Sequence, residues 1–204
     1  MKINHDRKLP IPFVIVDDFF TDDELELIWK EIDFLSDKDK LLKPKDTSSA
    51  HDENGKLKKS NLGIFVDDVY CQRETSNILK ITRKLFDKNF MDDLIKNNYI
   101  FNFYQRATSD RTLLSYYGDK DYYKSHHDDA DFTSIIWLYK EPKEFEGGEF
   151  KFTDYDINFE CKNNQLIIFP SDLLHEVSEI ELKSDKPWTG RYALVNFAYQ
   201  RVQV

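Results

Sequence analysis

The sequence predicts a single α+β domain, mainly β, in which helices come first and a β-rich core follows. Two patterns of helical spacing occupy the first half of the chain. From residue 98, short runs rich in tyrosine, phenylalanine, isoleucine and threonine recur, separated by glycine, aspartate, asparagine and proline. Short strands at such regular spacing are typical of a β-sandwich or barrel. The length of 204 residues suits one domain with a sizeable core.

The first half of the chain carries the helical signals. The stretch PFVIVDDFF is expected to form a short strand. Thr21 and Glu24 then form a T-x-x-E capping box, and helical apolar spacing follows to about residue 36. Residues 37–59 are polar and free of aromatic side chains, which favours a mobile lid or a disordered segment. Beyond them GIFVDDVY is expected to be extended, and a second helix is expected from about residue 75.

The second half reads as a series of strands. The runs are YIFNFYQR, TLLSYY, TSIIWLYK, EFKFTDY, QLIIF and RYALVNFAYQR. Aromatic and β-branched residues of this kind fit the pleated, half-buried surface of a sheet. We therefore expect one domain, with an N-terminal strand and helices over residues 1–97, including the flexible lid at 37–59, and the β-core over residues 98–201.

Composition narrows the classes of partner and location. The net charge is −9 and the pI near 5.1, which argues against a nucleic-acid partner. The chain has no apolar run long enough to span a membrane and no secretory signal at its start. Its two cysteines are too few for a disulfide framework, so a cytoplasmic location is expected. Lys58 and Lys59 are expected to be a solvated pair of charges. The sequence does not indicate the oligomeric state.

A cluster of candidate metal ligands lies in the stretch YYGDKDYYKSHHDDADFT, residues 116–133. Two His-x-Asp pairs overlap there, His126 with Asp128 and His127 with Asp129. Residues i and i+2 of a strand point to the same face, so either pair brings an imidazole and a carboxylate together. His175 follows a later strand-like run. Two histidines and one carboxylate form the facial triad of non-haem Fe(II) oxygenases.

A candidate anion-binding residue lies in a late strand-like run, TGRYALVNF. This run places Arg191 among apolar neighbours. A guanidinium buried in a barrel needs a carboxylate or an equivalent partner. A dicarboxylate cosubstrate bound at the iron would supply one, while a structural ion pair is the alternative.

Five ordered motifs over roughly residues 98–201 resemble a known family. They are Tyr116 with His126-x-Asp128, SIIWL, EGGEF, LHEV and GRYAL. In this order the chain resembles the Fe(II)- and 2-oxoglutarate-dependent dioxygenases, specifically the branch around the prolyl 4-hydroxylases. The resemblance implies a double-stranded β-helix (jelly roll) core with flanking N-terminal helices. It also implies Fe(II), 2-oxoglutarate and O2 as cofactor and cosubstrates, with ascorbate as a further candidate.

The resemblance also favours one of the two overlapping pairs. Family members often carry an aromatic residue three positions before the first histidine ligand. Tyr123 meets that count for His126, whereas Lys124 would occupy the position for His127. We therefore take His126, Asp128 and His175 as the predicted metal ligands and catalytic residues. The pair His127 and Asp129 remains the alternative.

Further roles follow from the resemblance alone. Arg191 is expected to bind the distal carboxylate of 2-oxoglutarate. Tyr116 is expected to donate a hydrogen bond to 2-oxoglutarate from its hydroxyl, with Tyr117 as the fallback. Trp137 occupies a position that commonly lines the same pocket, and Thr133 faces the same side of the strand. The gap of sixteen residues between His175 and Arg191 is longer than usual, so IELKSDKPWT is expected to be an enlarged hairpin turn.

The implied reaction is hydroxylation of an unactivated C–H bond, with succinate and CO2 as co-products. The leading substrate is a prolyl residue of a protein or peptide. A dioxygenase acting on a free amino acid or another small metabolite is the alternative. A non-catalytic, cupin-like metal-binding module is a second alternative, because a fold does not fix a function.

Overall fold

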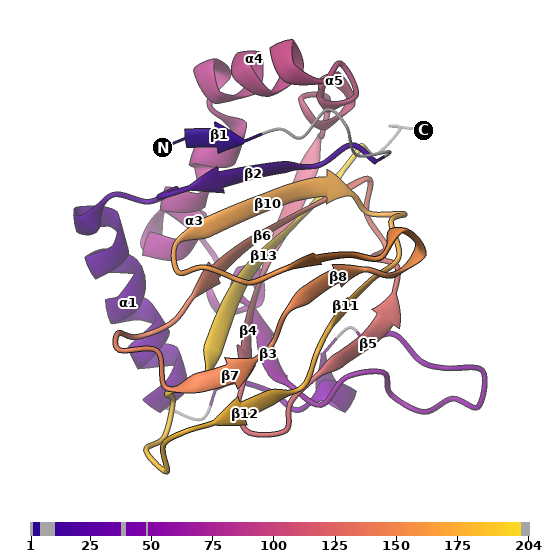
Figure 1. Cartoon of the computed structure of the whole chain (residues 1–204). Helices are drawn as coiled ribbons and strands as arrows, with labels where there is room; N and C mark the ends of the chain where they lie inside the picture. Colours follow the sequence, from indigo (N-terminus) through magenta and orange to yellow (C-terminus); the bar gives the residue numbers. More distant parts are fainter. Residues whose placement is uncertain (1, 5–10, 38–39, 48, 201–204) are drawn as a thin grey trace.

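The fold is built from two facing antiparallel sheets with helices on the outer side of the larger one (Figure 1). The computed structural model describes residues 2–4, 11–37, 40–47 and 49–200. Within these residues the larger sheet has seven strands, in the order β1, β2, β10, β6, β13, β4, β3. In that order their bounds are Lys2–Asn4, Val14–Asp17, Gln165–Pro170, Phe132–Leu138, Arg191–Tyr199, Ser109–Tyr117 and Leu62–Phe65.

The smaller sheet carries the segments that matter most for function. Its strands follow the order β5, β11, β8, β9, with bounds Tyr123–His126, His175–Val177, Phe150–Phe152 and Ile157–Phe159. A separate pair joins β7 (Phe145–Gly147) to β12 (Ile180–Leu182). The turn after β7 requires glycine, because a Cβ on Gly147 would lie 2.1 Å from the carbonyl oxygen of Glu179.

All five helices of the described residues precede β4 in the chain, with β1, β2 and β3 of the larger sheet before or among them. They are α1 (Asp22–Asp37), α2 (Val66–Val69), α3 (Asn77–Ile81), α4 (Lys88–Asn97) and α5 (Phe101–Tyr104). Short 3-10 turns lie at Pro44–Asp46, Arg73–Thr75, Thr82–Phe86 and Thr153–Tyr155. The capping box of α1 is present, because the Thr21 amide donates to Glu24 Oε2 at 2.8 Å and the Glu24 amide donates to Thr21 Oγ1 at 3.3 Å.

Two apolar cores lie on opposite faces of the larger sheet. The outer core lies between that sheet and the helices, and it contains Ile28 and Ile32 of α1 with Ile136 and Leu194 of the sheet. The inner core lies between the two sheets. Neighbouring residues of one strand therefore belong to different cores: Ile136 lies in the outer core and Trp137 in the inner one.

Three predicted elements differ in the structure. The expected single helix from residue 75 is divided into α3, a 3-10 turn and α4, because the Asp87 side chain accepts from the amides of Asn89 and Phe90 and starts a new helix. The expected strand YIFNFYQR is instead the short helix α5. The stretch GIFVDDVY is extended only through β3, after which α2 begins.

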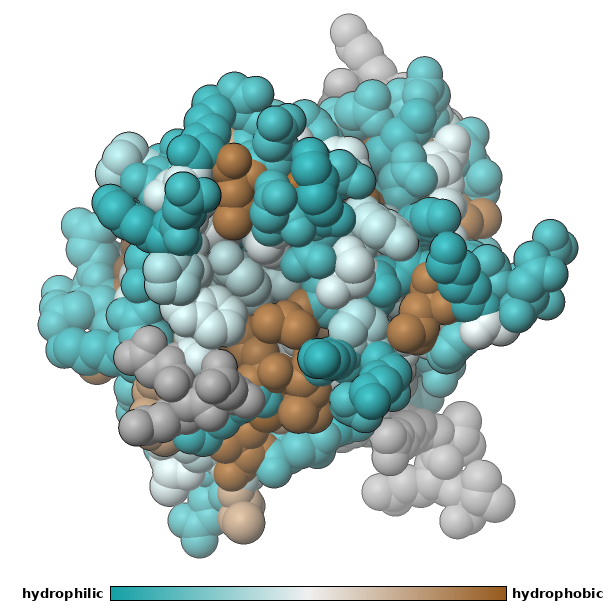
Figure 2. Space-filling view, turned by 90° about the horizontal axis from the view of Figure 1, so that it is seen from below, coloured by the Kyte–Doolittle hydropathy of each residue, from teal (hydrophilic) through white to brown (hydrophobic). Residues whose placement is uncertain are grey.

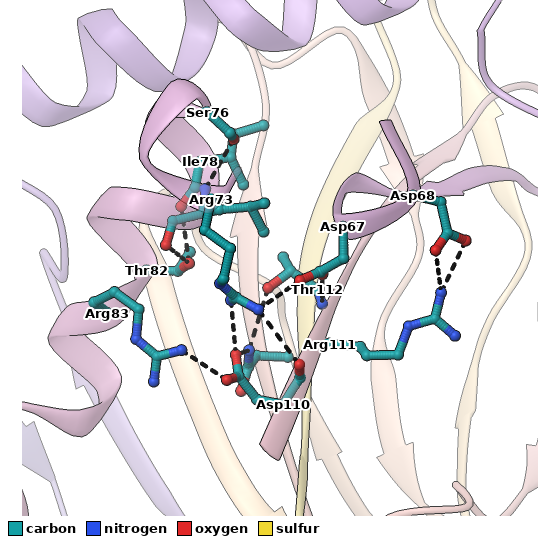
Figure 3. A network of polar contacts seen from close by, with 12 residues as sticks. Asp67, Asp68, Arg73, Ser76, Ile78, Thr82, Arg83, Asp110, Arg111 and Thr112 are labelled. Atoms are coloured by element: carbon teal, nitrogen blue, oxygen red, sulfur yellow. Dashed lines mark hydrogen bonds and ion pairs between the residues drawn. The ribbon is translucent and has the colours of Figure 1, made fainter. Parts of the chain in front are cut away.

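A polar network fastens the helical segment to β4 (Figure 3). Asp110 accepts hydrogen bonds from Arg73 Nη2 at 2.9 Å and from Arg83 Nη1 at 2.6 Å. Asp67 accepts from the Thr112 amide at 2.7 Å, and Arg73 also pairs with Asp67. The network fixes the start of β4, the strand that carries Tyr116 and Tyr117 at its other end.

The surface is largely hydrophilic, in keeping with a chain of which 33% of residues are charged. Figure 2 shows the face seen from below, where apolar groups gather near the centre of a mostly hydrophilic surface. Among the described residues, each helix falls short of the length and apolar character that a membrane crossing requires.

Candidate metal centre

Three candidate ligands meet between the sheets at one end of the smaller sheet. His126 ends β5 and His175 begins β11, and the two residues face each other in the antiparallel pairing. Asp128 follows in the loop after β5. Single ligand atoms of His126, Asp128 and His175 all lie within 4.8 Å of one another, and no other cluster of this kind occurs among the described residues.

Each histidine has one nitrogen fixed and one directed at the carboxylate. His126 Nδ1 lies 2.8 Å from the Lys124 carbonyl oxygen, and His175 Nδ1 lies 2.8 Å from that of Leu173. His126 Nε2 lies 3.5 Å from Asp128 Oδ1, and His175 Nε2 lies 3.4 Å from Asp128 Oδ2. A backbone carbonyl behind a histidine selects the tautomer that leaves Nε2 with a free lone pair. The two nitrogens and one oxygen therefore fit a divalent iron of the facial-triad type.

The protonation states suit ligands. Burial lowers the pKa of His175 to about 4, against the opposing effect of Asp128, so this imidazole is neutral near pH 7. Burial acts to raise the pKa of Asp128, but His175, His126 and Thr133 outweigh it, and the pKa is lowered overall. The site therefore presents the His175 imidazole and the Asp128 carboxylate in the deprotonated forms that bind metals.

The side chains around the ligands hold them in place. The Tyr123 ring stacks on the His126 ring with centroids 3.5 Å apart. Phe150 and Phe169 pack against His175, with centroids 5.4 and 5.0 Å from its ring. Thr133 Oγ1 donates to Asp128 Oδ2 at 2.7 Å. Thr133 thus contacts a predicted metal ligand, which is a different contact from the cosubstrate contact expected from the sequence.

The alternative pair lies outside this cluster. His127 and Asp129 are both exposed, and His127 Nδ1 lies 2.7 Å from the carbonyl oxygen of Asp172. Both side chains line a surface groove next to the metal centre. The structure therefore separates the two overlapping pairs by direction: His126 and Asp128 point inward, while His127 and Asp129 point to the groove.

Of the two adjacent tyrosines, Tyr117, expected from the sequence as the fallback for Tyr116, lies at the site. Tyr117 belongs to the inner core and lines the cavity that also contains the three candidate ligands. Tyr116 belongs to the outer core, where its ring packs against Trp188 and Tyr192. Its hydroxyl accepts from the Gly190 amide at 3.3 Å. The placement of Tyr116 near the cosubstrate is therefore wrong, because β4 turns this side chain to the helical face of the sheet.

Arg191 is buried next to Tyr117, with only 1% of its surface exposed. Its guanidinium carbon lies 4.7 Å from the centroid of the Tyr117 ring. No carboxylate of the described residues lies within ion-pair distance of it, and its Nε is buried without a hydrogen-bond partner. A buried cation with an unpaired donor fits a site for the carboxylate of a ligand. Trp137 also belongs to the inner core, where its ring centroid lies 5.8 Å from that of Phe150.

The segment 37–59 contributes to the site through its described residues. Ala50 donates its amide to the Tyr123 hydroxyl at 3.1 Å, and the Lys58 carbonyl accepts from the Lys124 amide at 2.8 Å. The end of the segment thus pairs with β5 beside His126. Residues 38, 39 and 48 of the predicted lid lie outside the described residues, and its mobility stays a prediction.

Sequence reasoning missed Lys59, which it treated as solvated. Only 4% of this residue is exposed, and its ammonium nitrogen lies 5.5 Å from the centroid of the Tyr123 ring. Lys58 is not a free solvated charge either, since its Nζ donates to the Ser125 carbonyl at 2.8 Å. The reading as a charge pair is wrong because pairing with β5 turns Lys59 into the cavity, and nothing in the local sequence signals that pairing.

The buried charge of Lys59 gives a prediction for the metal-free protein. Burial lowers its pKa from 10.5 to about 8, against the opposing effect of Asp128. The folded state thus binds fewer protons than the unfolded state between those values, and stability rises with pH across that window. Lys59→Met should raise the free energy of unfolding at pH 7 by roughly 2–3 kcal/mol, a gain that shrinks above pH 8. Urea unfolding at pH 7 and pH 9.5 tests this, and a pH-independent difference would contradict it.

A surface groove leads to the metal centre. It has a volume of about 360 Å³ and shares Lys59, Leu113, Tyr123, Asp128 and Phe197 with the inner cavity. Arg111 forms one wall, held by both carboxylate oxygens of Asp68 at 2.7 and 2.8 Å. A groove of this size that opens onto a metal site can admit a side chain or a small metabolite.

The comparison with known proteins agrees with this geometry. Residues 112–199, which include all three candidate ligands and Arg191, match the sequence profile of the 2OG-Fe(II) oxygenase superfamily. The name implies Fe(II) and 2-oxoglutarate (2OG) at the site. No curated protein matches the sequence.

Solved 2OG oxygenases share the fold across nearly the whole chain. A Pseudomonas putida prolyl-4-hydroxylase is 14% identical, covers 95% of each chain and gives a TM-score of 0.63. A Trichoplax adhaerens prolyl hydroxylase, solved with a hypoxia inducible factor peptide fragment, is 14% identical, with 94% of this chain and 84% of that chain covered and a TM-score of 0.62. A Burkholderia pseudomallei 2OG-Fe(II) oxygenase family oxidoreductase is 19% identical, with 93% and 85% covered and a TM-score of 0.57. At these identities the likeness confirms the jelly-roll fold alone.

Proposed function

We propose that this protein is an Fe(II)- and 2-oxoglutarate-dependent dioxygenase that hydroxylates a prolyl residue of a protein or peptide. The observation that carries the proposal is the arrangement of His126, Asp128 and His175. Both Nε2 atoms are directed at one carboxylate, while both Nδ1 atoms are fixed by backbone carbonyls. Three protein ligands leave open positions on an octahedral iron for cosubstrate and O2.

Each residue of the site would have a distinct role in binding the iron or 2-oxoglutarate. His126, Asp128 and His175 would hold Fe(II), and Thr133 would orient the carboxylate of Asp128 through its hydroxyl. Arg191 would bind the distal carboxylate of 2-oxoglutarate. Burial raises the pKa of Tyr117, which keeps its hydroxyl protonated and able to donate a hydrogen bond. When bound, the iron would supply the site at which O2 oxidises 2-oxoglutarate to succinate and CO2 and hydroxylates the substrate.

The choice of a peptidyl substrate is supported by the structural relatives and by the groove beside the metal centre. Two of the three structural relatives described above are prolyl hydroxylases, and the Trichoplax protein was solved with a peptide. The groove beside the metal centre has aromatic walls in Phe65, Phe197 and Tyr199, which suit an apolar ring such as that of proline. Ascorbate as a reductant and a cytoplasmic location are further expectations from the sequence.

An anaerobic titration with Fe(II) and 2-oxoglutarate tests the class of enzyme. The purified protein should develop a weak visible metal-to-ligand charge-transfer band. A folded, iron-loaded sample that shows no band and no 2-oxoglutarate binding would instead indicate a non-catalytic metal-binding module. Proline-containing peptides and free amino acids, assayed in parallel for succinate release and for a mass gain of one oxygen atom, would then separate a peptidyl substrate from a metabolite.

A further inference from the structure

The Cys161 thiol lies directly against the Arg191 guanidinium. Cys161 is in the connection between β9 and β10 and is 5% exposed. Arg191 Nη1 donates to Cys161 Sγ at 2.9 Å and to the Gly148 carbonyl oxygen at 2.6 Å. The thiol in turn donates to the same carbonyl oxygen at 3.3 Å. Two other chain segments, those of Cys161 and Gly148, therefore contact the same nitrogen of the guanidinium.

These contacts leave one edge of the guanidinium without a protein partner. Nη1 is occupied by the carbonyl and the sulfur. Nε is buried and makes no hydrogen bond, and Nη2 makes none to the described residues. Nε and Nη2 together form the side-on fork that can bind both oxygens of a carboxylate. The arrangement thus selects which edge of Arg191 is available to a ligand.

A thiol suits this role because it accepts a hydrogen bond without neutralising the arginine. Burial raises the pKa of the Cys161 thiol, against the opposing effect of Arg191. The sulfur therefore remains uncharged at neutral pH. An aspartate or glutamate at this position would form an ion pair with Arg191 and compete with a carboxylate ligand for the same cation.

We propose that Cys161 is a positioning residue that holds Arg191 by Nη1 and so presents its Nε–Nη2 edge to the distal carboxylate of 2-oxoglutarate. This role rests on the proposed function, because it takes 2-oxoglutarate to be the ligand of Arg191. It adds the identity of the group that orients the arginine and the edge that the arginine uses.

The test compares three single variants by anaerobic 2-oxoglutarate binding to the Fe(II)-loaded protein. Cys161→Ala should raise the dissociation constant about three- to tenfold, as expected for the loss of one ordinary hydrogen bond, since a thiol is a weak acceptor. Cys161→Ser keeps an acceptor at the same position and should restore most of the affinity. Cys71→Ala, at the exposed cysteine, is the matched control and should change nothing. Fe(II) affinity and turnover at saturating 2-oxoglutarate should stay at the wild-type values in all three.

A double-mutant cycle separates positioning from a general structural effect. In an Arg191→Met background, Cys161→Ala should have no further effect on 2-oxoglutarate binding, because the group it orients is gone. An equal loss in both backgrounds, or no loss in either, would overturn the proposal. If Cys161→Ala fails to fold, Cys161→Val keeps an apolar side chain without an acceptor and takes its place. Absence of 2-oxoglutarate binding in the wild type would refute the proposed function itself, a result distinct from an unaffected Cys161→Ala.

Discussion

Asp128→Ala should abolish Fe(II) binding and turnover, whereas Asp129→Ala should leave both close to the wild-type values. Asp128 is the carboxylate that both Nε2 atoms approach, at 3.5 and 3.4 Å. Loss of a group that merely orients a metal ligand costs roughly 10- to 100-fold, so loss of the ligand should cost more, about 10³-fold or beyond. Fe(II) affinity by calorimetry, with the charge-transfer band as a second readout, measures the difference.

Asp129→Ala is the matched control because it removes an identical side chain one residue away. Asp129 is exposed and lines the groove, so its loss leaves the triad intact. Circular dichroism of both metal-free variants must show the native fold for the comparison to hold. If Asp129→Ala lost the metal and Asp128→Ala kept it, the ligands would be His127 and Asp129, and the inward cluster would have another role.

The sequence predicted those parts of the fold that local chemistry determines. The helix α1 begins at a capping box whose two reciprocal hydrogen bonds are both formed. Strands β10 and β13 coincide with QLIIF and RYALVNFAY, where β-branched and aromatic residues are dense. The motif order also predicted the jelly roll, since each motif sits on a separate strand or turn of that fold.

The misassigned strand YIFNFYQR shows where residue preference alone fails. Phe101 and Tyr104 are fully buried, while Tyr99 and Phe103 are 69% and 48% exposed. Burial at positions three apart is the period of a helix and not of a strand. The aromatic content of the stretch favoured a strand, but packing of Phe101 and Tyr104 against Phe132 determines its conformation.

The sequence predicted the three residues that the structure brings together as candidate ligands, but not the side chains around them. Spacing relative to Tyr123 favoured His126, and that tyrosine stacks on the His126 ring. Tyr116 and Tyr117 are adjacent and point to opposite faces of the sheet, so the orientation of β4 decides which of them reaches the inner core. Lys59 and Cys161 come from segments whose position depends on long-range pairing, with β5 and with Arg191. No local pattern encodes such contacts.

Arg191→Met should weaken 2-oxoglutarate binding by about 2–5 kcal/mol, as expected when one partner of a buried charge pair is removed. The same variant should leave the metal-free protein at least as stable as the wild type. Arg191 has no carboxylate partner among the described residues, so its burial carries the cost of an unneutralised charge, which an apolar side chain of similar volume removes. The Gly148 carbonyl would still accept from the Cys161 thiol.

The two readouts together separate the ligand-binding role from the structural alternative. A structural ion pair predicts the opposite result for Arg191→Met: a large loss of unfolding free energy and little change in cosubstrate affinity. Urea unfolding of the metal-free protein and anaerobic 2-oxoglutarate titration of the Fe(II)-loaded protein measure the two quantities independently. An unchanged dissociation constant for 2-oxoglutarate would exclude Arg191 as its anchor. Lys59, the other buried cation, lines the metal cavity itself and would then be the next candidate for the carboxylate.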